Sequence, residues 1–263
     1  MNRLLLPALL TSLMLQVTPV SAASSGSATI DWDSLNIQLI DLSGGTNAPV
    51  LTWTNMYAQS SSDAYTVYPY DYQSSNLSSN DFVTSLDTNA TTANAQASAS
   101  HDVMALTAST AAQPGIVPIN WGWQQNYAYA SSYNSGDFTL TGYGLAIITI
   151  DWSVEGTGNL NDWSDYTYTS AYVSANYWDN LYNNGSASSG YALYTANNGS
   201  YATSGSFAMS VLNTNPNGTN GYLSASVYSQ SHSLSAPIPE PETYALMLVG
   251  LGLVGFMARR RKV

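Results

Sequence analysis

The chain has 263 residues, of which only 8% are charged, and it contains no cysteine. Its net charge at pH 7 is −11, and no Lys or Arg stands between Arg3 and Arg259. These values exclude disulfides and cysteine chemistry, exclude lysine chemistry in the body of the chain, and argue against nucleic acid as a partner, since DNA binding depends on Lys and Arg.

Residues 1–22 are typical of a secretion signal peptide. Arg3 precedes an apolar run from Leu4 to Val17, and Val20-Ser21-Ala22 fits the small-x-small rule for cleavage, with Ala23 as the new N-terminus. The apolar run is shorter than the ~20 residues that a stable membrane span needs. We therefore expect an N-terminal signal helix that is removed between Ala22 and Ala23 by signal peptidase during export.

The body of the chain, residues 23–237, has the two-residue period of β-strands. In the longest such stretch, 138–154, the even positions are apolar or Gly, which predicts a half-buried strand with a bend at Gly142 or Gly144. Similar alternation occurs at 35–39, 97–105, 166–172, 207–211 and 223–227, and Gly/Asn-rich turn signals separate the strands. The pattern predicts an all-β fold, an antiparallel β-sandwich or jelly-roll-like ectodomain.

Two parts of the body show weaker strand patterns. Residues 60–94 are rich in Ser, Asn, Thr and Asp, which predicts long loops. Residues 229–237, with the sequence SQSHSLSAP, have the composition of a linker.

An aromatic stretch follows residue 120. Trp121, Trp123 and Tyr127 alternate with smaller residues, so a strand would place them on one face together with Tyr129. If that face is exposed, its rings could stack on sugars. If it is buried, they belong to the core, which we favour because large aromatic side chains mostly supply burial.

An acidic region lies between residues 151 and 165. Asp151, Asp162 and Asp165 flank a Gly-rich turn, and such a density of carboxylates suits Ca²⁺, the one cofactor that the sequence indicates. The spacing is not that of an EF-hand or an RTX nonapeptide, so a solvated acidic loop is the favoured alternative. The sequence assigns no catalytic residue, because Glu155 is the only Glu of the body and the GxSxG motif is absent.

The C-terminal residues 238–263 form a separate region. Residues 243–258 are apolar and just long enough for a short transmembrane helix, and Arg259, Arg260, Arg261 and Lys262 follow directly. By the positive-inside rule these bases remain cytoplasmic and act as a stop-transfer signal. Just before the helix, Pro239, Glu240 and Pro241 hold the chain extended.

This order of features resembles the PEP-CTERM sorting signal of Gram-negative bacteria: a Pro-Glu-Pro box, a Leu/Gly-rich membrane helix and a terminal Arg cluster. The resemblance covers residues 238–263 only, and Ile238 replaces the usual Val. It implies recognition and processing by an exosortase, a membrane-embedded peptidase or transpeptidase. Carriers of such tails are often linked to exopolysaccharide and biofilm.

We therefore predict a non-enzymatic protein of the cell surface or extracellular matrix. It is anchored in the membrane through its C-terminus before processing, and exopolysaccharide is its candidate partner. One alternative is a carbohydrate-binding module, calcium-assisted or not, which an open aromatic surface would favour. A more distant alternative is a polysaccharide-active hydrolase, which a cleft with two facing carboxylates would favour.

Overall fold

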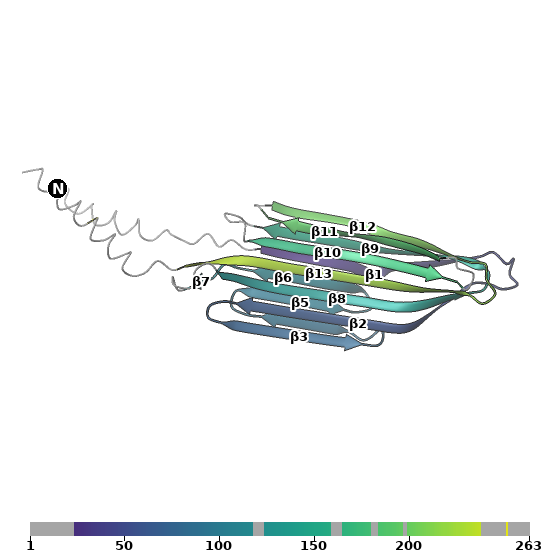
Figure 1. Ribbon diagram of the computed structural model, residues 1–263, viewed down its shortest axis with the longest axis horizontal. Coiled ribbons are helices and arrows are strands. Elements are labelled where there is room, and N and C mark those ends of the chain that lie inside the picture. Colours follow the sequence, from purple (N-terminus) through teal and green to yellow (C-terminus); the bar gives the residue numbers. More distant parts are fainter. Residues whose placement is uncertain are drawn as a thin grey trace, which may run out of the picture.

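The body of the chain is an antiparallel β-sandwich (Figure 1). The computed structural model describes residues 24–117, 124–158, 165–179, 184–196, 199–237 and Leu251. Its strands are β1 (Ser24–Asp41), β2 (Val50–Thr66), β3 (Asp71–Ser79), β4 (Leu86–Thr91), β5 (Ala95–His101), β6 (Ala105–Ala112), β7 (Ile116–Val117), β8 (Gln124–Thr141), β9 (Gly144–Gly158), β10 (Tyr166–Trp178), β11 (Asn184–Thr195), β12 (Gly199–Asn213) and β13 (Thr219–Pro237). The predicted all-β sandwich is confirmed.

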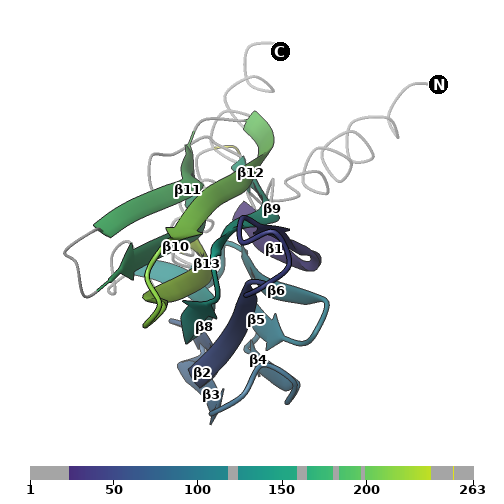
Figure 2. The same cartoon turned by 90° about the vertical axis from the view of Figure 1, so that its right-hand side faces the viewer.

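The strands form two sheets that pack face to face (Figure 2). One, called here the β1 sheet, has the order β12-β9-β1-β6-β5-β4. The other, the β13 sheet, has the order β11-β10-β13-β8-β2-β3, with the short β7 pairing in parallel with the end of β13. β11 and β12 form the edges on one side of the sandwich, and β3 and β4 those on the other.

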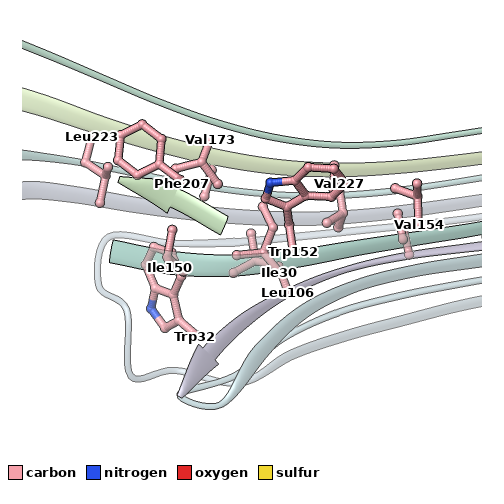
Figure 3. Close-up of a cluster of buried hydrophobic side chains, with 14 of the residues drawn as sticks. Ile30, Trp32, Leu106, Ile150, Trp152, Val154, Val173, Phe207, Leu223 and Val227 are labelled. Carbon is pink, nitrogen blue, oxygen red and sulfur yellow. The ribbon is translucent and has the colours of Figure 1, made fainter. Parts of the chain in front are cut away.

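The core lies between the sheets and follows the predicted alternation. Ile30, Leu106, Ile150 and Phe207 are fully buried on the β1 sheet. Val173, Leu223 and Val227 face them from the β13 sheet (Figure 3). Many of the other core positions are Ala, which lets the two sheets approach closely.

The stretch 138–154 is two strands and not one bent strand. β8 ends at Thr141 in the β13 sheet, and β9 begins at Gly144 in the β1 sheet. Gly142 makes this crossing possible: its φ is +77°, and a Cβ there would lie 2.3 Å from the Ala48 carbonyl oxygen. Even-numbered residues still face the core in both strands. Where a chain crosses between two facing sheets, the side that faces the core in the first sheet also faces it in the second.

Three local predictions were wrong. Residues 60–94 are mostly strand, divided among β2, β3 and β4, and 229–237 is the second half of β13, not a linker. The strand predicted over 97–105 ends at His101, and Val103 is exposed in a turn.

The Ser- and Thr-rich segments form strands because their hydroxyl groups pair across the structure. Ser62 bonds Thr88 at 2.7 Å between the two sheets. Thr110 of the β1 sheet likewise bonds Ser229 at 2.7 Å and Ser231 at 2.8 Å, both on β13. Hydrogen bonds of this kind satisfy buried polar groups that would otherwise oppose burial.

Candidate functional site

The outer face of the β13 sheet carries more than half of the 20 tyrosines of the chain, and we call it the tyrosine face. Six neighbouring strands contribute to it, because on each of them alternate residues point away from the core. Its tyrosines are Tyr57, Tyr65, Tyr72, Tyr127, Tyr129, Tyr133, Tyr166, Tyr168, Tyr172, Tyr194, Tyr222 and Tyr228. Ser, Gln and Asn occupy most of the positions between them.

One row of this face is a stack of aromatic rings across four strands. Tyr65, Tyr127, His232 and Tyr166 stand directly opposite one another in the strand register. The ring centroids of Tyr65 and Tyr127 are 5.0 Å apart, those of Tyr127 and His232 5.9 Å, and those of His232 and Tyr166 4.4 Å, all with stacked planes. Such cross-strand pairs stabilise the sheet.

This stack occupies both faces of the Tyr127 ring. β8 lies between β2 and β13, so one face of the Tyr127 ring meets Tyr65 and the other meets His232. Neither face is open to a sugar. The interpretation of Tyr127 and Tyr129 as core residues was also wrong, since Asn126, Ala128 and Ala130 point inward in their place. Trp121 and Trp123 lie outside the described residues.

Three of the exposed rings of this face lie towards β11, and a fourth, Tyr72 on β3 at the opposite edge, is 47% exposed. Tyr172 and Trp178 on β10 are 48% and 46% exposed, and Tyr194 on β11 is 58% exposed. We call these three residues the aromatic strip. Tyr172 packs on Gly190, where a Cβ would lie 3.0 Å from its ring, and nearly half of the Tyr172 surface is exposed. At ~3.4 Å per residue, Tyr172 and Trp178 stand about 20 Å apart along the strand.

Several tyrosines of this face have a raised pKa, so their hydroxyl groups stay protonated at neutral pH. Burial raises the pKa of Tyr228 to about 12, with Tyr129 and Tyr168 adding to the effect. Burial also raises the pKa of Tyr127, Tyr133 and Tyr166. The Tyr133 and Tyr222 hydroxyl oxygens are 2.5 Å apart in one hydrogen bond. The face therefore consists mostly of uncharged hydroxyl and amide groups, with the carboxylates of Asp63 and Asp137 among them and exposed aromatic rings towards β11.

The acidic residues proposed for calcium do not all lie together. Asp151 is exposed on the outer face of β9 and accepts a 2.5 Å hydrogen bond from Ser206. Asp165 is buried and directly precedes β10 of the β13 sheet. Its carboxylate accepts the backbone N–H of Leu234, on β13, at 2.6 Å. Asp162 lies outside the described residues. Within the ranges that the structure describes, no three acidic or His side chains converge on one point, so the calcium site stays a prediction.

Both ends of the body lie at one end of the sandwich. The first described residue, Ser24, is buried, and its hydroxyl donates to the His232 carbonyl oxygen at 2.7 Å. The fold thus begins two residues after Ala22, the predicted cleavage position. β13 continues to Pro237, immediately before the predicted sorting region. Pro239, Glu240, Pro241, the Arg259–Lys262 cluster and both terminal helices lie outside the described residues.

A family model for the PEP-CTERM protein-sorting motif matches residues 237–262. The chain carries a PEP-CTERM sorting motif. The protein is therefore exported, anchored through its C-terminus and sorted by exosortase, as the sequence predicted. The match begins at the last residue of β13, so the sorting motif directly adjoins the folded body.

The match covers roughly a tenth of the chain and leaves the sandwich outside it. No curated protein matches the chain. No helix in the described part of the chain has both the length and the apolar character to cross a membrane.

Sequence reasoning missed the aromatic strip, although part of its signal was visible. The shared face of Tyr166, Tyr168 and Tyr172 follows from their spacing, and Trp178 continues the same alternation. Which of these rings are open depends on the neighbouring strands. The β11 partner of Tyr172 is Gly190, a pairing that the sequence alone does not reveal.

Proposed function

We propose that the protein is a non-enzymatic component of the cell surface or extracellular matrix that contacts neutral exopolysaccharide through its tyrosine face. The observation that carries this proposal is the aromatic strip, set in a sheet face of mostly uncharged hydroxyl and amide groups, on an exported protein that carries a PEP-CTERM sorting motif. Open aromatic rings bind the apolar faces of sugars, and the surrounding hydroxyl and amide groups match sugar hydroxyls.

The charge of the protein favours a neutral polysaccharide. The body carries 14 acidic residues and no Lys or Arg, so its net negative charge would repel an anionic polymer. Asp63 and Asp137 are the acids nearest the tyrosines of the face, and both are engaged: Asp63 accepts from Tyr72 at 2.7 Å and Asp137 from Asn55 at 2.8 Å.

The carboxylates of the other sheet do not favour hydrolysis. Asp31 stands opposite Asp151 in the strand register, and Glu155 is nearby on β9. A glycosidase needs one carboxyl group that burial keeps protonated, whereas these side chains line shallow open depressions on an exposed face. Ser206 and Ser27 donate to Asp151 and Glu155, which gives these carboxylates a structural role.

A binding experiment tests the proposal. The exported protein is incubated with insoluble neutral glucan, and the bound fraction is compared between the wild type and a Tyr172→Ala, Trp178→Ala double variant. We expect at least a tenfold loss of affinity in the double variant, because each open ring contributes on the order of 1 kcal/mol.

Tyr70→Ala is the matched control, since Tyr70 is 72% exposed in the β2–β3 turn, away from the strip. Equal binding by the wild type and the strip variant would contradict the proposed surface. A further set with EDTA tests the calcium-assisted form, in which chelation lowers binding. Preference for an anionic polymer such as alginate without added divalent cations would contradict the charge argument.

A further inference from the structure

β12 is an edge strand with a long unpaired side. It pairs with β9 over all of Gly199–Asn213 in a register without a bulge. On its other side, the described part of the chain contains no strand hydrogen-bonded to it. An edge of this kind presents a row of backbone N–H and C=O groups to any further strand.

The residues that point these groups outward can be identified. The Ser206 carbonyl oxygen accepts a hydrogen bond from Ser189 of β11, so it points away from β9. Asp151 stands opposite Ser206 in the register and donates its backbone N–H to the Ser34 hydroxyl, on the side of β9 away from β12. The backbone groups of Ser206 and Asp151 therefore do not bond each other. Because the direction alternates along a strand, the even-numbered residues of β12 carry the free backbone groups, among them Ala208, Ser210 and Leu212.

The sequence of β12 contains none of the usual features that protect an edge strand against pairing, although Ser189 of β11 bonds the Ser206 carbonyl oxygen. Natural edge strands often carry charged residues, Pro or bulges. β12 has none of these, and its even-numbered side chains are Ser, Ala and one Leu. The opposite edges differ, since β3 begins with Asp71 and the six-residue β4 contains Asp87. β12 is also firmly held, because Phe207, Met209 and Val211 are buried in the core.

We propose that two copies of this protein associate edge to edge through β12, so that their β1 sheets join as one continuous antiparallel sheet. The pairing is symmetric, with the same strand contributed by each copy. This proposal does not depend on the polysaccharide contact, which lies on the outer face of the other sheet.

The absence of charge on this side of the sandwich allows a second copy of the protein to be the partner. Two molecules of net charge −11 repel each other wherever their acids meet. Residues 180–239 contain no charged residue at all, and they include both β11 and β12, the two stacked edges on this side (Figure 2). Exposed Tyr191, Tyr201 and Leu212 border the same side. Depletion of charge with enrichment of Tyr is the composition of protein interfaces.

Analytical ultracentrifugation of the exported protein, without polysaccharide, tests the proposal. The wild type should shift from monomer to dimer over roughly 1–100 µM. Ser210→Pro should raise the dimer dissociation constant at least tenfold, because it removes an outward N–H and places a ring in the path of the second strand. The ladder with β9 should remain, because that N–H does not point towards β9. Ser210→Ala is the matched control and should dimerise as the wild type does.

A second variant covers the case in which Ser210→Pro does not fold. Ala208→Asp with Ser210→Asp retains every backbone N–H and places like charges on both edges, and it should also prevent dimerisation. Hydrogen exchange at 207–213 should slow as the wild-type concentration rises, while exchange in β4 stays constant. A wild type that remains monomeric at the highest concentration would overturn the proposal, and so would a folded Ser210→Pro protein that dimerises normally.

Discussion

His101 shows how a single residue couples the stability of the sandwich to pH. Its side chain is completely buried on β5, and Nδ1 lies 3.1 Å from the Thr84 carbonyl oxygen. Nε2 has no hydrogen-bond partner among the described residues. Burial lowers the pKa of His101 below its ordinary value of 6.5, because a charged imidazolium would lose its hydration in the core.

Acidification should therefore destabilise the protein through His101. Below pH 6.5 the unfolded chain takes up a proton that the folded chain resists, so the contribution is complete above pH 6.5 and is lost as pH falls towards the lowered pKa. The slope is at most about 1.4 kcal/mol per pH unit for this residue. Denaturant unfolding at pH 7.5 and pH 5 should show a smaller difference for His101→Gln than for the wild type.

His232→Gln is the companion variant. Burial also lowers the pKa of His232, which lies in the stack of the tyrosine face, so this variant should likewise show a smaller pH dependence than the wild type. An identical pH dependence for the wild type and His101→Gln would show that the buried histidine does not govern acid stability.

β13 is the element on which the β13 sheet depends. It is the C-terminal strand of the body and yet lies in the middle of its sheet, between β10 and β8. It pairs with β8 from Thr219 to Ser235 and with β10 from Asn220 to His232. The sheet can therefore close only after the chain has been exported as far as its sorting motif.

Two truncations separate the role of β13 from that of the tail. A chain that ends at residue 237 retains the whole strand and should unfold cooperatively, with the stability of the exported protein. A chain that ends at 228 leaves residues 124–130 of β8 and 166–169 of β10 without their shared neighbour, and it should lose more than the ~5 kcal/mol that marks the most severe point mutations. Thermal unfolding followed by circular dichroism distinguishes the two, and equal stability would contradict the central role of the strand.

The elements also show how far sequence alone predicts this fold. Alternation predicted which side of a strand faces the core, as at Phe207, Met209 and Val211, because that choice depends on local burial. It did not predict that β8 and β9 lie in different sheets, since the crossing at Gly142 depends on contact with Ala48. Composition misled for residues 60–94, because hydroxyl pairs such as Ser62–Thr88 form only in the assembled sandwich. The open rings of the aromatic strip could not be predicted for the same reason.

At the scale of the whole molecule, the predicted signal peptide and the sorting motif lie immediately before and after the folded sandwich. The first strand begins just after the predicted signal-peptide cleavage position, and the last ends where the sorting motif begins. The Ser24–His232 hydrogen bond holds the first strand near the last one. Both processing events can therefore occur without removing any part of the sandwich, and the hydrogen bonds of its strands remain intact.

Intact-mass measurement of the surface-extracted protein, from cells that contain an exosortase, tests this account most directly. We predict a chain that begins at Ala23 and ends between residues 237 and 243, because the two signals lie outside the fold and the Pro-Glu-Pro box adjoins β13. Such a chain retains all of β1 and β13. A mature protein that still carries Arg259 to Val263, or one that has lost residues of β13, would contradict it.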